Sequence, residues 1–87
     1  MDMEIIYTPG AIRLLKKLPQ ADRETIKKLV KLLSFWPNDD RHIIHLSGRD
    51  DFRLKQGRHR VIFDVDEERA EVHITYVGLR DEKTYRK

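Results

Sequence analysis

Hydrophobic and polar residues alternate along the stretch from Phe52 to Asp66, and this pattern predicts two β-strands joined at Gly57. Side chains alternate across a strand, so the apolar residues of the stretch share one face and the polar residues share the other. The pattern favours an antiparallel pair with a core on one side only. The apolar positions are Phe52, Leu54, Val61, Phe63 and Val65.

The residues before this stretch predict a short strand and a first helix. The run EIIY, at 4–7, is the strand. Thr8 is a suitable N-cap and Pro9 suits the first helical position, where no amide donor is needed. The helix reaches about Leu18, and Pro19 ends it because the residue before a proline avoids the helical region. Its apolar stripe consists of Ala11, Leu14, Leu15 and Leu18.

A second helix is expected to begin with Asp22 as its cap and to end around residues 35–37, which read FWP. Its apolar residues, at helical spacing, are Ile26, Leu29, Val30 and Leu33. The two stripes predict a helical hairpin that covers the sheet. Residues 38–51 are expected to form a loop, since they show little periodicity, and a loop this long is often functional.

The last strand is expected over residues 70–77, with Gly78 closing it and a polar tail over residues 79–87. Alternation places Val72, Ile74 and Tyr76 inward and His73, Thr75 and Val77 outward. The order is a strand, two helices and a three-stranded antiparallel meander. It predicts one α+β domain over residues 1–87, with the helices on one face of a small, mostly antiparallel sheet.

Composition narrows the function classes. The 87 residues contain no cysteine, so no disulfide is available, and no segment approaches the roughly 18 apolar residues of a membrane helix. We expect a cytoplasmic protein that does not bind membranes. Charged residues make up 38% of the chain, the net charge is +3, and arginine and lysine cluster from Arg53 onward. Clustered cations indicate an anionic partner.

The run LSGRDDFRLKQGRHRVIF, followed by YVGLR and a tyrosine near the C-terminus, resembles the RelE/ParE toxin superfamily of toxin–antitoxin systems. The family pattern has a glycine in the preceding loop, an aromatic, two basic residues around a leucine, a glycine, and Tyr-Arg before an apolar strand. The matching positions are Gly48, Phe52, Arg53, Leu54, Lys55, Gly57, His59 and Arg60. The order of the expected elements also agrees, so the resemblance covers essentially the whole chain and implies a RelE-like, microbial-ribonuclease type of fold.

The resemblance implies a function. RelE-like members cut messenger RNA in the decoding site of the ribosome and are held inactive by a cognate antitoxin. The implied partners are therefore an antitoxin and a ribosome with its messenger and ribosomal RNA, with no metal or small-molecule cofactor. Two alternatives stay open: a ParE-like inhibitor of DNA gyrase, or an inactive homologue that only binds its antitoxin. Carried over by position, the implied catalytic residues are Arg53, Lys55, Arg60, Arg80 and Tyr85.

Cleaving RNA without a metal requires a base for the 2′-hydroxyl, a stabiliser of the phosphorane, and an acid for the leaving oxygen. Arg60 and Arg80 suit the second task, because a guanidinium stays charged and donates to two phosphate oxygens at once. His59 stands where many relatives have tyrosine, and it is a candidate base beside Lys55, since histidine changes charge near neutral pH. Leu79 stands where several subgroups have a histidine. Tyr85 is expected to stack on a base or to move a proton.

Simpler interpretations apply to several of these residues. Arg53 and Lys55 fit a solvated strand face, and Arg60 fits a salt bridge to Asp64 or to a carboxylate of the loop. Further cations are candidates for holding RNA or for an ordinary solvated surface: Lys16, Lys17, Lys27, Lys28, Lys31 and Arg58. No metal site is expected, because the histidines and aspartates of the loop lack a convincing third ligand; they are Asp39, Asp40, His42 and His45.

Overall fold

The structure is a computed structural model that describes residues 3–35, 43–45 and 51–80, with the backbone alone considered at 43–45. The described residues form two α-helices, a short 3₁₀ helix and a five-stranded sheet. In chain order the elements are β1 (Glu4–Tyr7), α1 (Pro9–Lys16), α2 (Gln20–Lys31), the 3₁₀ helix η1 (Leu32–Phe35), β2 (Ile43–His45), β3 (Asp51–Gln56), β4 (His59–Asp66) and β5 (Glu71–Leu79).

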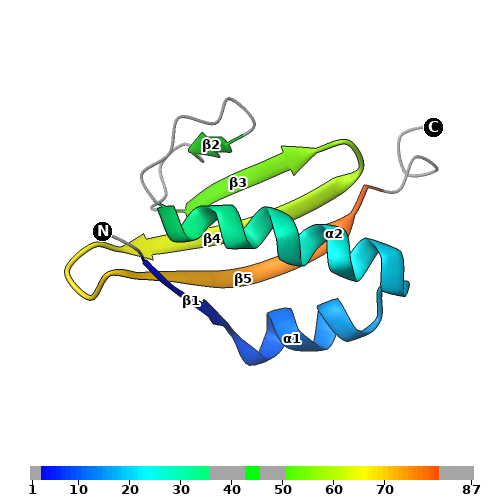
Figure 1. Ribbon diagram of the computed structural model, residues 1–87, viewed down its shortest axis with the longest axis horizontal. Coiled ribbons are helices and arrows are strands. Elements are labelled where there is room, and N and C mark those ends of the chain that lie inside the picture. The colour runs from blue at the N-terminus through cyan, green and yellow to red at the C-terminus, as the bar shows by residue number, and fades with distance from the viewer. Residues whose placement is uncertain (1–2, 36–42, 46–50, 81–87) are drawn as a thin grey trace.

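The sheet has the order β1-β5-β4-β3-β2 (Figure 1). The β1 strand runs parallel to β5, and every other neighbouring pair is antiparallel. This confirms the α+β class and the meander expected from the sequence. The prediction of a loop over residues 38–51 was partly wrong, because β2 lies within this range. The β2 strand pairs with β3, and Ile43 lies opposite Leu54. A strand of three residues is too short to leave a periodic pattern, and the neighbouring strand supplies its hydrogen bonds.

Capping explains where the helices begin. The Thr8 side chain accepts a hydrogen bond from the Ala11 amide at 3.3 Å, and Pro9 occupies the first turn of α1, as predicted. For α2 the N-cap is Pro19, so the prediction that Asp22 caps this helix was wrong. Asp22 lies in the first turn and is buried, and its carboxylate is bonded to the side chains of Arg58, in the β3–β4 turn, and His59, at the start of β4.

A single core lies between the helices and one face of the sheet. The α1 helix packs mainly on β5 and the α2 helix on β4. Phe63 is fully buried at the centre, and its ring stacks on Phe52 with 5.5 Å between the centroids. The buried apolar residues are Ala11, Leu15, Ile26, Leu29, Val30, Leu33, Leu54, Val61, Phe63, Val72, Ile74 and Val77. The opposite face of the sheet, here called the open face, carries no helix of the described residues.

The pairing of β4 with β5 contains a bulge. Phe63 lies opposite Ile74, but Ile62 lies opposite Tyr76, so Thr75 is an extra residue in β5. The Thr75 hydroxyl donates to the Ile62 carbonyl at 3.2 Å. The bulge reverses the alternation beyond it. Val77 is therefore buried and Tyr76 is exposed, the reverse of the prediction for both residues.

Candidate functional site

Strand pairing defines which residues are neighbours on the open face, because directly opposite residues of antiparallel strands project from the same side. Moving away from the β3–β4 turn, the successive rows become steadily less basic. The first row is Lys55, Arg60 and Gly78; the second is Arg53, Ile62 and Tyr76; the third is Asp51, Asp64 and His73. Arg53, Lys55 and Arg60, here called the basic face, thus gather at one end of the sheet.

The basic face is electrostatically unfavourable without a partner. Like charges directly opposite one another on neighbouring strands destabilise a sheet, and Lys55 lies opposite Arg60. Within the described residues, no carboxylate forms an ion pair with either side chain. The buried Nε of Arg53 also lacks a hydrogen-bond partner there. Such a surface is suited to an anion that approaches from outside.

Arg60 is held in place by the turn that precedes it. Its Nη1 donates to the Gly57 carbonyl at 2.7 Å and to the His59 carbonyl at 2.9 Å. The salt bridge to Asp64 considered from the sequence is not formed, because Asp64 faces His73 instead. Gly57 has a φ of +60° at the first central position of this two-residue turn, a conformation that glycine adopts without strain. The turn therefore fixes one nitrogen of the Arg60 guanidinium at the basic end of the sheet.

Arg80 follows β5 and reaches the same turn. Its backbone amide donates to the Arg58 carbonyl at 2.7 Å, and its side chain is exposed. The structure thus brings Arg80 to the end of the sheet where Lys55 and Arg60 lie. Tyr85, the other candidate near the C-terminus, lies outside the described residues.

His59 lies on the other face of the sheet from the basic face. Its Nε2 is 3.0 Å from Oδ1 of Asp22. Nη2 of Arg58 donates to both oxygens of the same carboxylate, at 3.2 and 3.0 Å. The hydrogen bond from Arg58, with that from His59, holds the pKa of Asp22 below its usual value. Arg58 and His59 are therefore tied to helix α2, and we do not include His59 in the site as a base.

Tyr76 is a member of the open face that the sequence analysis missed. The bulge at Thr75 places it in the row of Arg53, and its ring lies along β5 over Gly78. A Cβ atom added at Gly78 would lie 2.5 Å from the Tyr76 hydroxyl, so only glycine leaves room for the ring in this position. The signal in the sequence was the pair Tyr76-Val77, of which valine is the residue better suited to a core.

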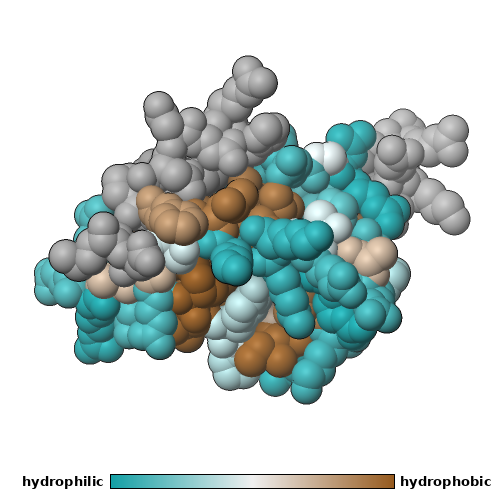
Figure 2. Space-filling view, viewed as in Figure 1, coloured by the Kyte–Doolittle hydropathy of each residue, from teal (hydrophilic) through white to brown (hydrophobic). Residues whose placement is uncertain are grey.

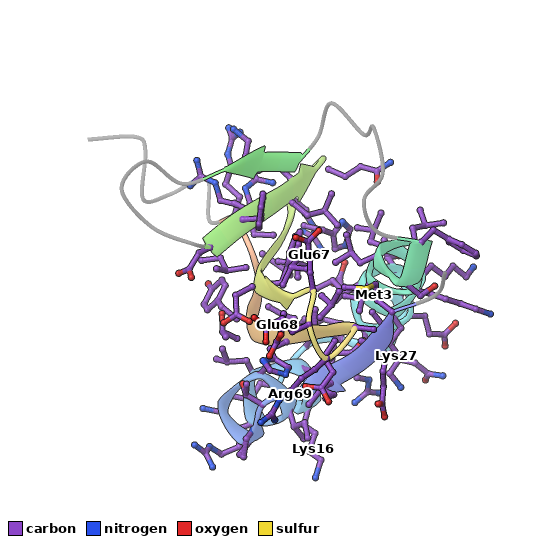
Figure 3. All side chains as sticks on the ribbon, turned by 90° about the vertical axis from the view of Figure 1, so that its left-hand side faces the viewer. Met3, Lys16, Lys27, Glu67, Glu68 and Arg69 are labelled. Atoms are coloured by element: carbon purple, nitrogen blue, oxygen red, sulfur yellow. The ribbon has the colours of Figure 1, made fainter. Side chains whose placement is uncertain are left out.

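The helix lysines belong to a different surface. Lys16, Lys17, Lys27, Lys28 and Lys31 are exposed. The helical side is largely hydrophilic, with hydrophobic surface between the charged side chains (Figure 2). Lys16 and Lys27 also line a groove of about 430 Å³ between α1 and α2, and Lys16 projects to the periphery in Figure 3. These lysines are separated from the basic face by the sheet itself.

The end of the sheet near the β4–β5 turn is acidic. Glu67 and Glu68 lie in this turn, which stands in front in Figure 3. His73 binds Glu71 at 2.9 Å and Asp64 at 3.3 Å, and its hydrogen bond with Glu71 is the main reason that its pKa is raised.

Within the described residues no group of three or more histidine, aspartate or glutamate side chains is placed to hold a metal ion. The loop residues Asp39, Asp40 and His42 lie outside them, as does the side chain of His45.

No helix in the described part of the chain is both long and apolar enough to cross a membrane. No protein-family model matches the chain, and no curated protein sequence matches it.

Solved structures do match. The RelBE2 toxin–antitoxin complex of Mycobacterium tuberculosis aligns with a TM-score of 0.81 and 25% identity, covering 92% of this chain and 93% of the matched chain. The isolated RelE toxin of E. coli aligns with a TM-score of 0.76 and 22% identity, covering 97% of each chain. The archaeal RelE–RelB complex of Pyrococcus horikoshii aligns with a TM-score of 0.75 and 22% identity, covering 92% of this chain and 97% of the matched chain. The resemblance to this superfamily that the sequence indicated is confirmed in the fold.

Proposed function

We propose that this chain, which has the fold of the RelE toxins, is the toxin of a toxin–antitoxin system and cuts messenger RNA bound to the ribosome. The observation that carries the proposal is the basic face at the β3–β4 turn. Arg53, Lys55 and Arg60 form two adjacent rows there, and Arg80 joins them. These are four of the five residues that the resemblance, carried over by position, implies to be catalytic; the fifth is Tyr85.

The arrangement suits phosphate chemistry. A phosphorane carries two negative charges, and a fixed cation stabilises it without reorganising during the reaction. Arg60 meets this requirement because the carbonyls of Gly57 and His59 hold one end of its guanidinium. Arginine stays charged, so Lys55, in its neutral amine form, is the side chain of the basic face that can accept a proton from the 2′-hydroxyl. Arg80, whose backbone is bonded to the same turn, stabilises the phosphorane together with Arg60, and Arg53 binds a flanking phosphate.

Tyr76 adds an aromatic surface beside the cations. Aromatic side chains that alternate with cations are typical of single-stranded RNA sites, where a base stacks on the ring. Because Tyr76 lies in the row of Arg53, a base stacked on it would place its phosphate near the basic face. The ribosome would supply the remaining alignment of the messenger, which accounts for a site built mainly from cations and a single candidate base.

The antitoxin is the second proposed partner. The matched structures include RelE chains in complex with RelB antitoxins, from Mycobacterium tuberculosis, E. coli and Pyrococcus horikoshii. We expect a cognate antitoxin of this chain to neutralise it, with no metal or small-molecule cofactor involved in either activity. Expression of the chain alone should arrest growth, and co-expression of the antitoxin should relieve the arrest.

The decisive experiment measures messenger cleavage in a reconstituted translation reaction, with and without ribosomes. Wild type should cut the coding sequence only when ribosomes are present, and Arg80→Ala should not cut. Arg69→Ala is the matched control, since it removes the same charge from the turn at the acidic end. Absence of cutting by folded wild type would overturn the ribonuclease proposal, and a supercoiling assay with gyrase would then test the ParE-like alternative.

A further inference from the structure

Three segments that are distant in the sequence meet at the basic end of the sheet: the start of α2, the β3–β4 turn and the end of β5 (Figure 1). The α2 helix contributes Asp22, which is only 8% exposed and is the one buried charged side chain among the described residues. A buried carboxylate is costly unless its oxygens are paired and hydrogen-bonded. Its partners therefore indicate what Asp22 does.

Both partners of Asp22 belong to the β3–β4 turn region. Arg58 donates from Nη2 to both carboxylate oxygens, and His59 lies 3.0 Å from Oδ1 through Nε2. A histidine whose Nε2 carries hydrogen can donate this bond whether or not the ring is charged. The bonds also keep Asp22 ionised, as the lowered pKa of its carboxyl indicates. One helical side chain thus binds two consecutive residues of the β3–β4 turn region.

The backbone of the same turn holds the arginines of the proposed site. The carbonyls of Gly57, Arg58 and His59 are consecutive, and each accepts a hydrogen bond. The Gly57 and His59 carbonyls accept from Nη1 of Arg60. The Arg58 carbonyl accepts from the amide of Arg80 at 2.7 Å. The side chains of the turn are therefore bound on the helical side while its carbonyls bind the two arginines.

We propose that Asp22 is a positioning residue that sets the placement of Arg60 and Arg80 through the β3–β4 turn. The part of this inference that concerns cleavage rests on the proposed function. The structural part does not, because it states only that loss of the Asp22 carboxylate loosens the turn. The two parts are tested by separate measurements.

Amide hydrogen exchange tests the structural part. In Asp22→Ala, exchange of the Arg80 amide should be about tenfold faster or more, because the carbonyl that accepts its bond lies in a turn that is no longer tied to α2. Amides of the β1–β5 pair should be unchanged. Asp22→Asn, which keeps the shape and one acceptor oxygen, should give a smaller effect in the same amide and serves if the alanine variant does not fold. Glu24→Ala is the matched control, since it removes an exposed carboxylate from the same helix.

A double-mutant cycle tests the catalytic part. Asp22→Ala should lower kcat for ribosome-bound messenger by about tenfold in the wild-type background and by less in the Arg60→Ala background, because the part of its effect that acts through Arg60 is then absent. Equal losses in both backgrounds, or unchanged exchange at the Arg80 amide, would overturn the proposal. If wild type does not cleave at all, the proposed function fails, and the exchange measurement still decides whether Asp22 positions the arginines.

Discussion

Replacing Arg60 with alanine separates a structural role of this residue from a chemical one. The change removes two hydrogen bonds from Nη1 to the carbonyls of Gly57 and His59, together with one guanidinium of the basic face. A hydrogen bond of this kind contributes roughly 0.5–1.5 kcal/mol net. Gly57 is exposed, so water replaces the lost donor, and the lower end of that range, roughly 0.5 kcal/mol, applies to each of the two bonds. The expected loss of unfolding free energy is therefore about 1 kcal/mol.

A loss of this size barely affects the amount of folded protein. A domain of this length is stable by roughly 5–15 kcal/mol, so nearly all molecules stay folded, and the melting temperature falls by about 4–8 °C. Cleavage should fall far more. Removing one fixed donor from the charge that develops in a transition state costs roughly 10²–10³ in kcat. The predicted signature is a small change in stability with a large change in cleavage.

The assay is single-turnover cleavage of ribosome-bound messenger, with urea unfolding of the same protein samples. Arg60→Lys should recover only part of the activity, because an ammonium carries the charge but cannot donate in the planar fork of arginine. Arg69→Ala removes an equal charge from the far end of the sheet and should leave cleavage unchanged. Cleavage by Arg60→Ala within about tenfold of wild type, or about 1.4 kcal/mol in activation free energy, would refute the assignment.

Three further predictions follow from the packing and the charges. Phe63→Ala should lower the unfolding free energy by about 3–5 kcal/mol in urea denaturation, because this ring is fully buried and stacked on Phe52; a loss below about 1 kcal/mol would contradict the core as described. Gly78→Ala should reduce cleavage more than stability, since the new Cβ would lie 2.5 Å from the Tyr76 hydroxyl and displace the ring; unchanged cleavage would remove Tyr76 from the site. The pKa of His73 is raised by Glu71 and then by Asp64, so protonated His73 stabilises the folded state. This contribution is complete at pH below the unfolded-state pKa of roughly 6.5 and is lost as pH rises through the higher pKa of the folded state. His73→Gln should flatten the pH dependence of stability across that window, and an unchanged dependence in urea unfolding at several pH values would contradict it.

The basic face was predictable because it depends on local information. Alternation along β3 and β4 decides which side chains face away from the core, and the turn at Gly57 fixes the pairing of the two strands. Arg53, Lys55 and Arg60 follow directly from these two features. The resemblance added Arg80, whose backbone the structure then places beside the same turn.

The missed features all depend on contacts between distant segments. The bulge at Thr75 is a property of how β5 pairs with β4, so alternation within β5 alone assigned Tyr76 to the core. Asp22 has the residue type of a helix cap and lies near the expected start of the helix, and only the folded structure shows that its carboxylate is bonded to Arg58 and His59 instead. The same contact places His59 away from the basic face, although its residue type suits a general base.

The distribution of charge on the open face constrains how a messenger would cross it. The two cation-rich rows lie at the β3–β4 turn, and the third row, with the carboxylates of Asp51 and Asp64, lies two residues beyond the row of Arg53. An RNA backbone laid along the strands would pass from attraction into repulsion within about 7 Å, at roughly 3.4 Å per residue. A backbone laid across the strands near the turn would meet Lys55, Arg60 and then Arg80 at the end of β5 without approaching a carboxylate of the third row. Under the proposed function, the scissile phosphate therefore lies over the first row, and the acidic rows restrict the messenger to this direction.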